Sequence, residues 1–104
     1  MHELSIAEGI AGEVRDRAAG RPVRRVTVRV GALHAVQPDA LRFGFQLAAA
    51  GIELVIEHRP ATVLCRACGR ESELPDQILL CSCGSADVAV TGGRELEIVT
   101  MELA

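Results

Sequence analysis

The stretch of sequence that decides the fold is RRVTVRVG, residues 24–31. From Arg25 to Val30 apolar and polar side chains alternate strictly, with valine at every second position. Because successive side chains of a β-strand point to opposite faces of the sheet, this alternation is typical of a strand that is buried on one face. The sequence therefore predicts a half-buried strand over residues 24–30, which Gly31 closes.

Two further segments show a similar alternation. Residues 52–58 read IELVIEH, and residues 94–103 read RELEIVTMEL. Both are bounded by glycine on the N-terminal side, where strands commonly begin after a turn. With the first strand, these segments predict a three-stranded sheet.

A helix is predicted before the first strand, over residues 5–18. Apolar side chains recur there at four-residue spacing, at Ile6, Ile10 and Val14. This spacing gives one apolar stripe along a helix. Ser5 and Glu8 form an S-x-x-E pattern, which predicts a capping box that begins the helix at Ser5.

A second helix is predicted over residues 38–50, where Pro38 suits a first helical position and Gly51 a C-terminal stop. The predicted order is thus helix, strand, helix, strand, insertion, strand. This order indicates an α+β fold, in which two helices pack on one face of the three-stranded sheet.

The sequence pattern changes at Pro60. Residues 61–91 contain all four cysteines and no long periodic run. A segment with so few apolar side chains needs a further stabilising element, such as a bound metal or disulfides, in order to fold. We therefore predict two domains: an α+β domain formed by residues 1–60 plus 92–104, and an inserted domain formed by residues 61–91.

The inserted segment has a zinc-ribbon pattern. Cys65 and Cys68 form a C-x-x-C pair, Cys81 and Cys83 form a C-x-C pair, and a glycine follows each pair. Four thiolates suit tetrahedral Zn(II) and leave no open coordination position for catalysis. Disulfides and free thiols remain alternatives, although cysteines in a reducing compartment favour a metal.

The N-terminus, MHE, offers a second set of metal donors. The Met1 amine, the His2 amide and imidazole nitrogens and the Glu3 carboxylate form a nitrogen and oxygen set that favours Ni(II) or Cu(II) over zinc. An exposed histidine on a frayed chain end is the alternative. His34 and His58 are interpreted as surface polar residues, His34 being the better spare ligand because it lies in a predicted loop.

Composition excludes several classes of function. The chain has 104 residues, 11 basic and 14 acidic side chains and a formal net charge of -3, which argues against a nucleic-acid partner. No apolar run is long enough to span a bilayer, and no signal peptide is recognisable, so we expect a cytoplasmic protein. The common catalytic motifs are absent, and we expect no enzyme activity and no catalytic residues.

Together these stretches resemble a known family. MHELSIAEGI, RRVTVRVGALHAVQPDALRFGF, the paired cysteines that end in CGS, and GRELEIVTMEL are similar, in this order, to the HypA/HybF hydrogenase maturation proteins, which are nickel metallochaperones. The resemblance covers essentially the whole chain.

The resemblance implies that nickel is held by His2, with the Met1 amine and Glu3 close by. It also implies a structural zinc ion, whose ligands are Cys65, Cys68, Cys81 and Cys83. The implied partners are a nickel-loading GTPase and the large subunit of a [NiFe] hydrogenase, while some relatives also serve urease. Such a protein hands over an ion and does not catalyse a reaction.

Two features depart from the family pattern. The second cysteine pair is C-x-C, where the family usually has C-x-x-C, and Ala32 stands where members commonly carry an acidic residue. Two other functions remain as alternatives: a zinc-ribbon interaction module without nickel delivery, and a small redox protein with iron in the four thiolates. The sequence leaves open a monomer or a homodimer.

Overall fold

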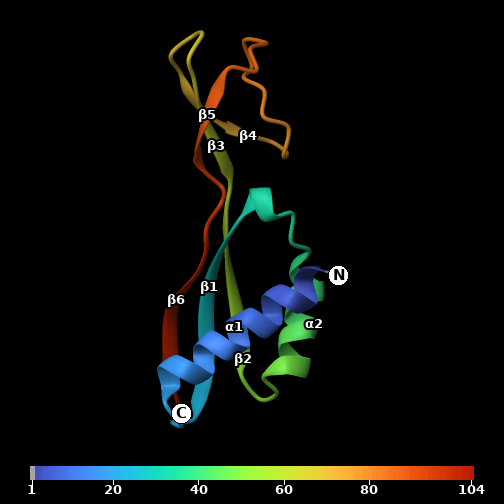
Figure 1. The fold of residues 1–104 in the computed structure, drawn as a ribbon, viewed down its shortest axis with the longest axis vertical. Helices are drawn as coiled ribbons and strands as arrows, with labels where there is room; N and C mark the ends of the chain where they lie inside the picture. The colour runs from blue at the N-terminus through green and yellow to red at the C-terminus, as the bar shows by residue number, and fades with distance from the viewer. Residues whose placement is uncertain (1) are drawn as a thin grey trace. The chain divides into compact units, whose positions relative to one another are not determined.

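The computed structural model describes residues 2–104 (Figure 1). Its elements are α1 (His2–Ala18), β1 (Val23–Gly31), the 3-10 helix η1 (Ala32–His34), α2 (Pro38–Ala48), β2 (Glu53–Arg59), β3 (Ala61–Cys65), β4 (Glu71–Leu74), β5 (Val88–Gly92) and β6 (Leu96–Leu103). They form two three-stranded sheets, ordered β2-β1-β6 and β4-β3-β5. The predicted α+β class is therefore confirmed.

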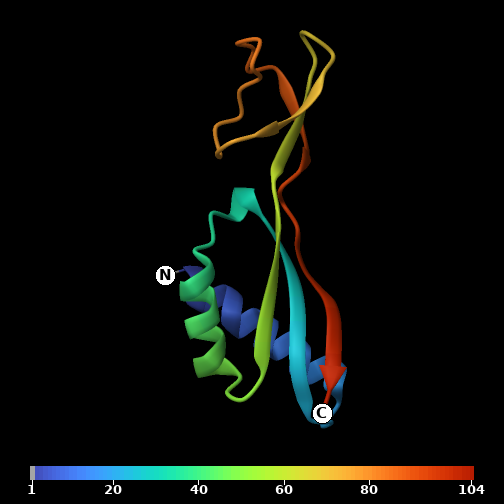
Figure 2. The ribbon, with the colours of Figure 1, turned by 180° about the vertical axis from the view of Figure 1, so that it is seen from behind.

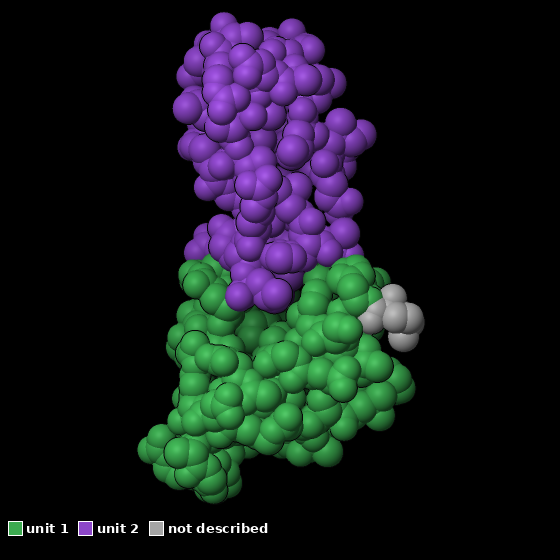
Figure 3. All heavy atoms as spheres, in the orientation of Figure 1, with its two compact units in different colours: residues 1–29, 36–57, 97–104 green, residues 30–35, 58–96 purple. Residues whose placement is uncertain are grey.

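The chain divides into two compact units, which Figure 3 colours separately. The first unit comprises residues 1–29, 36–57 and 97–104, and the second comprises residues 30–35 and 58–96. None of the helices in residues 2–104 is long and apolar enough to cross a membrane.

The first unit is built around a core that consists of aliphatic side chains and Phe45. Helix α1 lies across the strands of its sheet, in front of them in Figure 1 and behind them in Figure 2. Val26 and Val28 of β1 are fully buried, as are Leu41 and Phe45 of α2. Helices α1 and α2 approach closely at Gly44, where an added Cβ would lie 3.2 Å from the Cβ of Ala7. The apolar side chains at every second position of β1 and those on the apolar stripe of each helix thus pack in one core.

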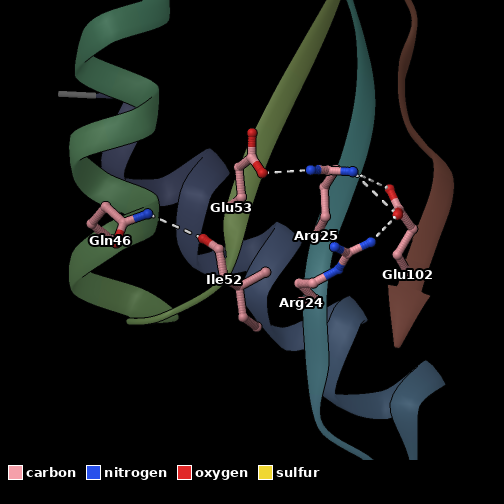
Figure 4. Close-up of polar contacts among 6 residues, drawn as sticks. All are labelled: Arg24, Arg25, Gln46, Ile52, Glu53 and Glu102. Carbon is pink, nitrogen blue, oxygen red and sulfur yellow. Dashed lines mark hydrogen bonds and ion pairs between the residues drawn. The ribbon is translucent and has the colours of Figure 1, made fainter. Parts of the chain in front are cut away.

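Arginines occupy the other face of β1 and tie it to both neighbouring strands. Arg25 donates to Glu53 of β2 at 2.9 Å and to Glu102 of β6 at 3.0 Å (Figure 4). These hydrogen bonds, to Glu53 first and Glu102 second, raise the pKa of Arg25. Arg29 makes the corresponding pairs with Glu57 at 2.8 Å and Glu97 at 3.0 Å. The strand alternation thus places an ordered row of ion pairs on the polar face.

The second unit has a much smaller core. Strand β3 lies between β4 and β5 and is antiparallel to both. Its buried cluster consists of Ala61, Val63 and Leu74, with a few half-buried aliphatic side chains against it. Residues 75–87, between β4 and β5, form neither a helix nor a strand.

Two glycines permit a close backbone approach in the second unit. The Gly31 N–H donates to the Glu95 carbonyl at 2.7 Å, and the Leu33 N–H donates to the Gly93 carbonyl at 2.9 Å. A Cβ on Gly31 would overlap the Gly93 carbonyl group. Gly93 itself has a φ of 109°, which side chains rarely adopt. Backbone hydrogen bonds therefore connect residues 31–33 to residues 93–95, where the absence of a glycine side chain leaves room for the close approach.

The predicted start of the first helix is wrong. Helix α1 begins at His2, so Ser5 lies inside it and cannot form the predicted capping box with Glu8. Tertiary contacts hold the additional turn: the Gln37 N–H donates to the Glu3 carboxylate at 3.1 Å, and Leu4 lies against the bare backbone of Gly44. The loop predicted after the first strand also contains a short 3-10 helix, η1.

Candidate metal centres

Each cysteine pair lies on a tight hydrogen-bonded turn. In the first, the Gly69 N–H donates to the Cys65 carbonyl at 2.8 Å, and in the second the Gly84 N–H donates to the Cys81 carbonyl at 2.9 Å. The two glycines have positive φ angles of 78° and 94°. Both pairs therefore lie in a turn that ends in a glycine of positive φ, but the turn of the C-x-x-C pair is closed by a hydrogen bond over four positions and that of the C-x-C pair by one over three.

The turns bring all four sulfur atoms together. The Sγ atoms of Cys65 and Cys83 are 3.7 Å apart, and so are those of Cys68 and Cys81. All four lie within 4.8 Å of one another. A regular tetrahedron with metal–sulfur bonds of about 2.3 Å has edges of about 3.8 Å. The sulfur atoms are too far apart for disulfides, which need about 2.05 Å, and they fit the ligand shell of a single tetrahedral ion.

Backbone N–H groups favour thiolates on the first turn. The Cys68 N–H lies 3.4 Å from the Cys65 sulfur and is the main cause that lowers the pKa of Cys65. The Arg70 N–H is the main cause that lowers the pKa of Cys68 to about 6. Because thiolates are the form that binds a metal ion, this turn is prepared for one.

The second turn differs in its electrostatics. The Ser85 N–H lowers the pKa of Cys83, but hydrogen bonds with the neighbouring Cys81 and Cys65 sulfurs outweigh it and raise the pKa to about 11. Four thiolates repel one another without a cation between them, whereas a divalent ion stabilises all four. Cys65 and Cys81 are buried, while Cys68 and Cys83 are exposed, so an ion would have one shielded side and one open to solvent.

The N-terminal donors lie on the first turn of α1. The His2 Nε2 atom is 3.6 Å from the Glu3 Oε2 atom. The Glu3 side chain is 15% exposed and the His2 side chain 51% exposed. Met1, the third predicted nickel donor, lies outside the described residues.

Glu3 is positioned by α2. Its carboxylate accepts a hydrogen bond from the Gln37 N–H, and this bond is the main cause that lowers the pKa of Glu3. Gln37 is also the N-cap of α2, since its side-chain oxygen accepts from the Ala40 N–H at 2.7 Å. Sequence reasoning missed Gln37, although Pro38 at the first helical position signals a cap one residue earlier.

His2 and Glu3 are the first two residues of α1 that the structure describes. The His2 amide, its imidazole and the Glu3 carboxylate therefore lie on one turn. Such a nitrogen and oxygen set is what Ni(II) or Cu(II) prefers.

The other histidines lie elsewhere. The His34 Nε2 atom is 2.9 Å from the Arg94 carbonyl oxygen, and His58 lies near the end of β2. Among residues 2–104, the four cysteines are the one group of three or more His, Cys, Asp or Glu side chains close enough to share an ion. The structure thus brings the predicted zinc ligands together, and it places His2 and Glu3 side by side.

At the level of sequence, a family match and the relatives of this chain point to the same family. The family described as hydrogenase/urease nickel incorporation, metallochaperone, HypA matches residues 1–103. A hydrogenase maturation factor HypA from a Nostoc species is 38% identical over 99% of this chain and 96% of its own length. Another, from Chloroflexus aggregans, is 42% identical over 98% of both chains.

Solved structures share the fold. The solution structure of the Ni metallochaperone HypA from Helicobacter pylori matches with a TM-score of 0.65 and 20% identity, over 97% of this chain and 96% of that one. A second solution structure of a HypA protein matches with a TM-score of 0.57 and 19% identity, over 97% of this chain and 92% of that one.

Proposed function

The chain belongs to the HypA family of hydrogenase and urease nickel-incorporation metallochaperones, and from this premise we propose that it binds Ni(II) at its N-terminus and delivers it to the large subunit of a [NiFe] hydrogenase. The observation that carries the proposal is the placement of His2 and Glu3, whose Nε2 and Oε2 atoms lie 3.6 Å apart on one helical turn.

The proposed nickel ligands are the Met1 amine, the His2 amide and imidazole nitrogens, and the Glu3 carboxylate. The Gln37 N–H is the main cause that lowers the pKa of Glu3, so this hydrogen bond favours the charged form of the carboxylate. The half-exposed His2 side chain leaves the ion accessible to an acceptor. A cargo ion has to leave again, and a site with few ligands on the protein surface suits that task.

The second proposed metal is a structural Zn(II) held by Cys65, Cys68, Cys81 and Cys83. The Sγ–Sγ distances of 3.7 Å support this assignment. Four protein ligands fill a tetrahedral shell, so the ion supplies folding energy and no catalytic water. We therefore propose that the protein is a carrier with no catalytic residue.

The proposed partners are the nickel-loading GTPase of hydrogenase maturation and the hydrogenase large subunit. A net charge of -3 argues against nucleic acid as a partner. Four thiols gathered around one point, at distances too long for disulfides, fit a reducing compartment such as the cytoplasm.

Nickel titration of the purified chain with its native start tests the proposal. We expect about one high-affinity nickel ion per chain, and a dissociation constant at least about tenfold higher in His2→Ala, because the substitution removes the imidazole, a nitrogen donor that suits Ni(II). His58→Ala is the matched control and should bind as the native protein does. Residues added before Met1 should weaken binding as well, because they remove the free amine.

Equal nickel affinity in the native protein and in His2→Ala would contradict the N-terminal assignment. Absence of nickel binding from the native protein would contradict nickel delivery, and it would favour a zinc-ribbon interaction module instead.

A further inference from the structure

The four cysteines of the second unit differ in their exposure to solvent. Cys65 and Cys81 are buried, while Cys68 and Cys83 are exposed. Because a dissolved oxidant reaches a sulfur atom from the solvent, oxidation begins at an exposed cysteine. The set of metal ligands therefore has a reactive side as well as a shielded one.

Each exposed sulfur atom has a buried sulfur atom of the other turn beside it. The Sγ atoms of Cys68 and Cys81 are 3.7 Å apart, and so are those of Cys83 and Cys65. A disulfide needs about 2.05 Å, so the two atoms of a pair have to approach further before they bond. Both pairs run between the turns, so two such disulfides would join the same two turns that a single ion joins.

Cys68 has a basic residue beside its sulfur atom. The backbone N–H and the side chain of Arg70 both act on this sulfur. When a thiolate cleaves a peroxide, negative charge moves from the sulfur to the departing oxygen, and a nearby guanidinium stabilises that charge. Exposed cysteines in such electropositive surroundings are typically the reactive ones.

We propose that Cys68 is the site at which a hydroperoxide oxidises this protein, that Cys81 resolves the product, and that oxidation exchanges the zinc ion for the disulfides Cys68–Cys81 and Cys65–Cys83. This inference rests on the zinc assignment made under the proposed function. It adds a modification site to residues that otherwise have only a structural role.

The reaction balances with hydrogen peroxide as the oxidant. The Cys68 sulfur attacks one peroxide oxygen, the O–O bond breaks and hydroxide leaves, so that a sulfenic acid forms. The Cys81 thiolate then attacks the oxidised sulfur, the S–O bond breaks and a second hydroxide leaves as the disulfide forms. Two protons convert both hydroxides to water. Two sulfur atoms are thus oxidised while one peroxide is reduced.

The first disulfide removes two of the four metal ligands. Thiolates are the form that binds a metal ion, and the sulfur atoms of a disulfide carry no charge. The ion therefore leaves, and Cys83 and Cys65 react with a second peroxide in the same way. A thiol reductant reverses both disulfides, after which zinc binds again.

Peroxide titration of the purified, zinc-loaded full chain tests the proposal. A chelating dye measures zinc release, and mass spectrometry of proteolytic fragments maps the disulfides. We expect about two peroxide molecules to be consumed for each zinc ion released, with the pairs Cys68–Cys81 and Cys65–Cys83. A reagent that traps sulfenic acids should label Cys68 first. The control is the same chain, metal-free and unfolded in denaturant, which should give a mixture of pairings.

Two arginine variants test the reactive position without changing a sulfur ligand. Arg70→Gln should slow zinc release several-fold, because it removes the cation beside the Cys68 sulfur. Arg66→Gln is the matched control, because Arg66 lies in the same turn but pairs with Asp87 at 2.9 Å. It should release zinc at the native rate.

Disulfides within each turn of the zinc-loaded protein would overturn the proposed pairing, and so would the mixture expected of the unfolded chain. First trapping of Cys83, a native rate in Arg70→Gln, or equal slowing by Arg66→Gln would overturn Cys68 as the reactive site. Zinc that stays bound while peroxide is consumed would overturn the exchange. A native chain that binds no zinc would instead contradict the zinc assignment, and nickel titration of the same preparation reports separately on nickel binding.

Discussion

The two units of this chain bury very different amounts of apolar surface. Among the described residues, the largest fully buried side chains of the first unit are Phe45, Leu41, Val14, Val26 and Val28, contributed by two helices and a strand. The second unit contributes Val63 and Cys65 to the same class. The first unit is therefore stabilised by its core. The second unit has four sulfur atoms placed for one ion, and we infer that metal binding stabilises it.

The largest expected effect is that of removing the proposed metal ion from the second unit. A strong chelator, or the substitution Cys65→Ser, should abolish amide hydrogen-exchange protection in β3, β4 and β5 and leave α1 and β1 protected. Structural zinc contributes roughly 10–16 kcal/mol in small zinc-dependent peptides, far more than the small core here supplies. Ser82→Ala, which alters the same turn without removing a sulfur, is the control. Full protection of the metal-free second unit would show that its core suffices.

The next largest effect concerns the core of the first unit. Phe45→Ala should lower the free energy of unfolding by about 3–5 kcal/mol, since the ring is fully buried and its removal leaves a cavity. Phe43→Ala, on the same helix but 67% exposed, should change it by less than about 0.5 kcal/mol. Chemical denaturation, followed by a signal from α1 or α2, measures both. Similar losses in the two variants would show that α2 does not pack as described.

A smaller effect distinguishes two glycines. Gly31→Ala should destabilise the second unit by about 1–3 kcal/mol, because its Cβ would overlap the Gly93 carbonyl group. Gly12→Ala, within α1 and with no atom within 4 Å of the added Cβ, should stabilise the first unit by about 0.5–1 kcal/mol. Thermal unfolding with a probe in each unit gives the two signs. A stabilising Gly31→Ala would contradict the close backbone approach.

The smallest expected effect is that of the charges on the polar face of β1. Hydrogen bonding to Arg25 is the main cause that lowers the pKa of Glu102 below its ordinary 4.5. A lowered native pKa contributes stability above the unfolded pKa, and this contribution is lost as the pH falls through the native value. Glu102→Gln should therefore destabilise the first unit slightly at pH 7 and no longer do so in strong acid. A difference between the native protein and the variant that is independent of pH would contradict the ion pair.

Local patterns predicted much of the fold. The alternation of residues 24–30 identified β1, because the pleat of a strand fixes which side chains face the core. Pro38 marked the start of α2, because its ring suits a first helical turn. The glycine after each cysteine pair predicted a tight turn there, because only glycine adopts those positive φ angles easily. The nickel donors and the zinc ligands were assigned by the same kind of reasoning, and their roles remain predictions.

Contacts between distant residues decided what the patterns did not. Ser5 and Glu8 satisfy the capping-box pattern, yet α1 begins at His2, where Glu3 meets Gln37, 34 positions along the chain. Local capping preferences are worth about 1 kcal/mol, so a few tertiary contacts outweigh them.

Periodicity and turn chemistry within a few residues were thus enough to predict the α+β class, the two helical stripes and the two cysteine turns. Only contacts between distant residues place His2 and Glu3 on a helical turn that the Gln37 N–H holds through Glu3. Such contacts also bring Gly31 against Gly93. Such features depend on contacts between residues that are distant in sequence. Their free energies are small, and a local sequence pattern does not reveal them.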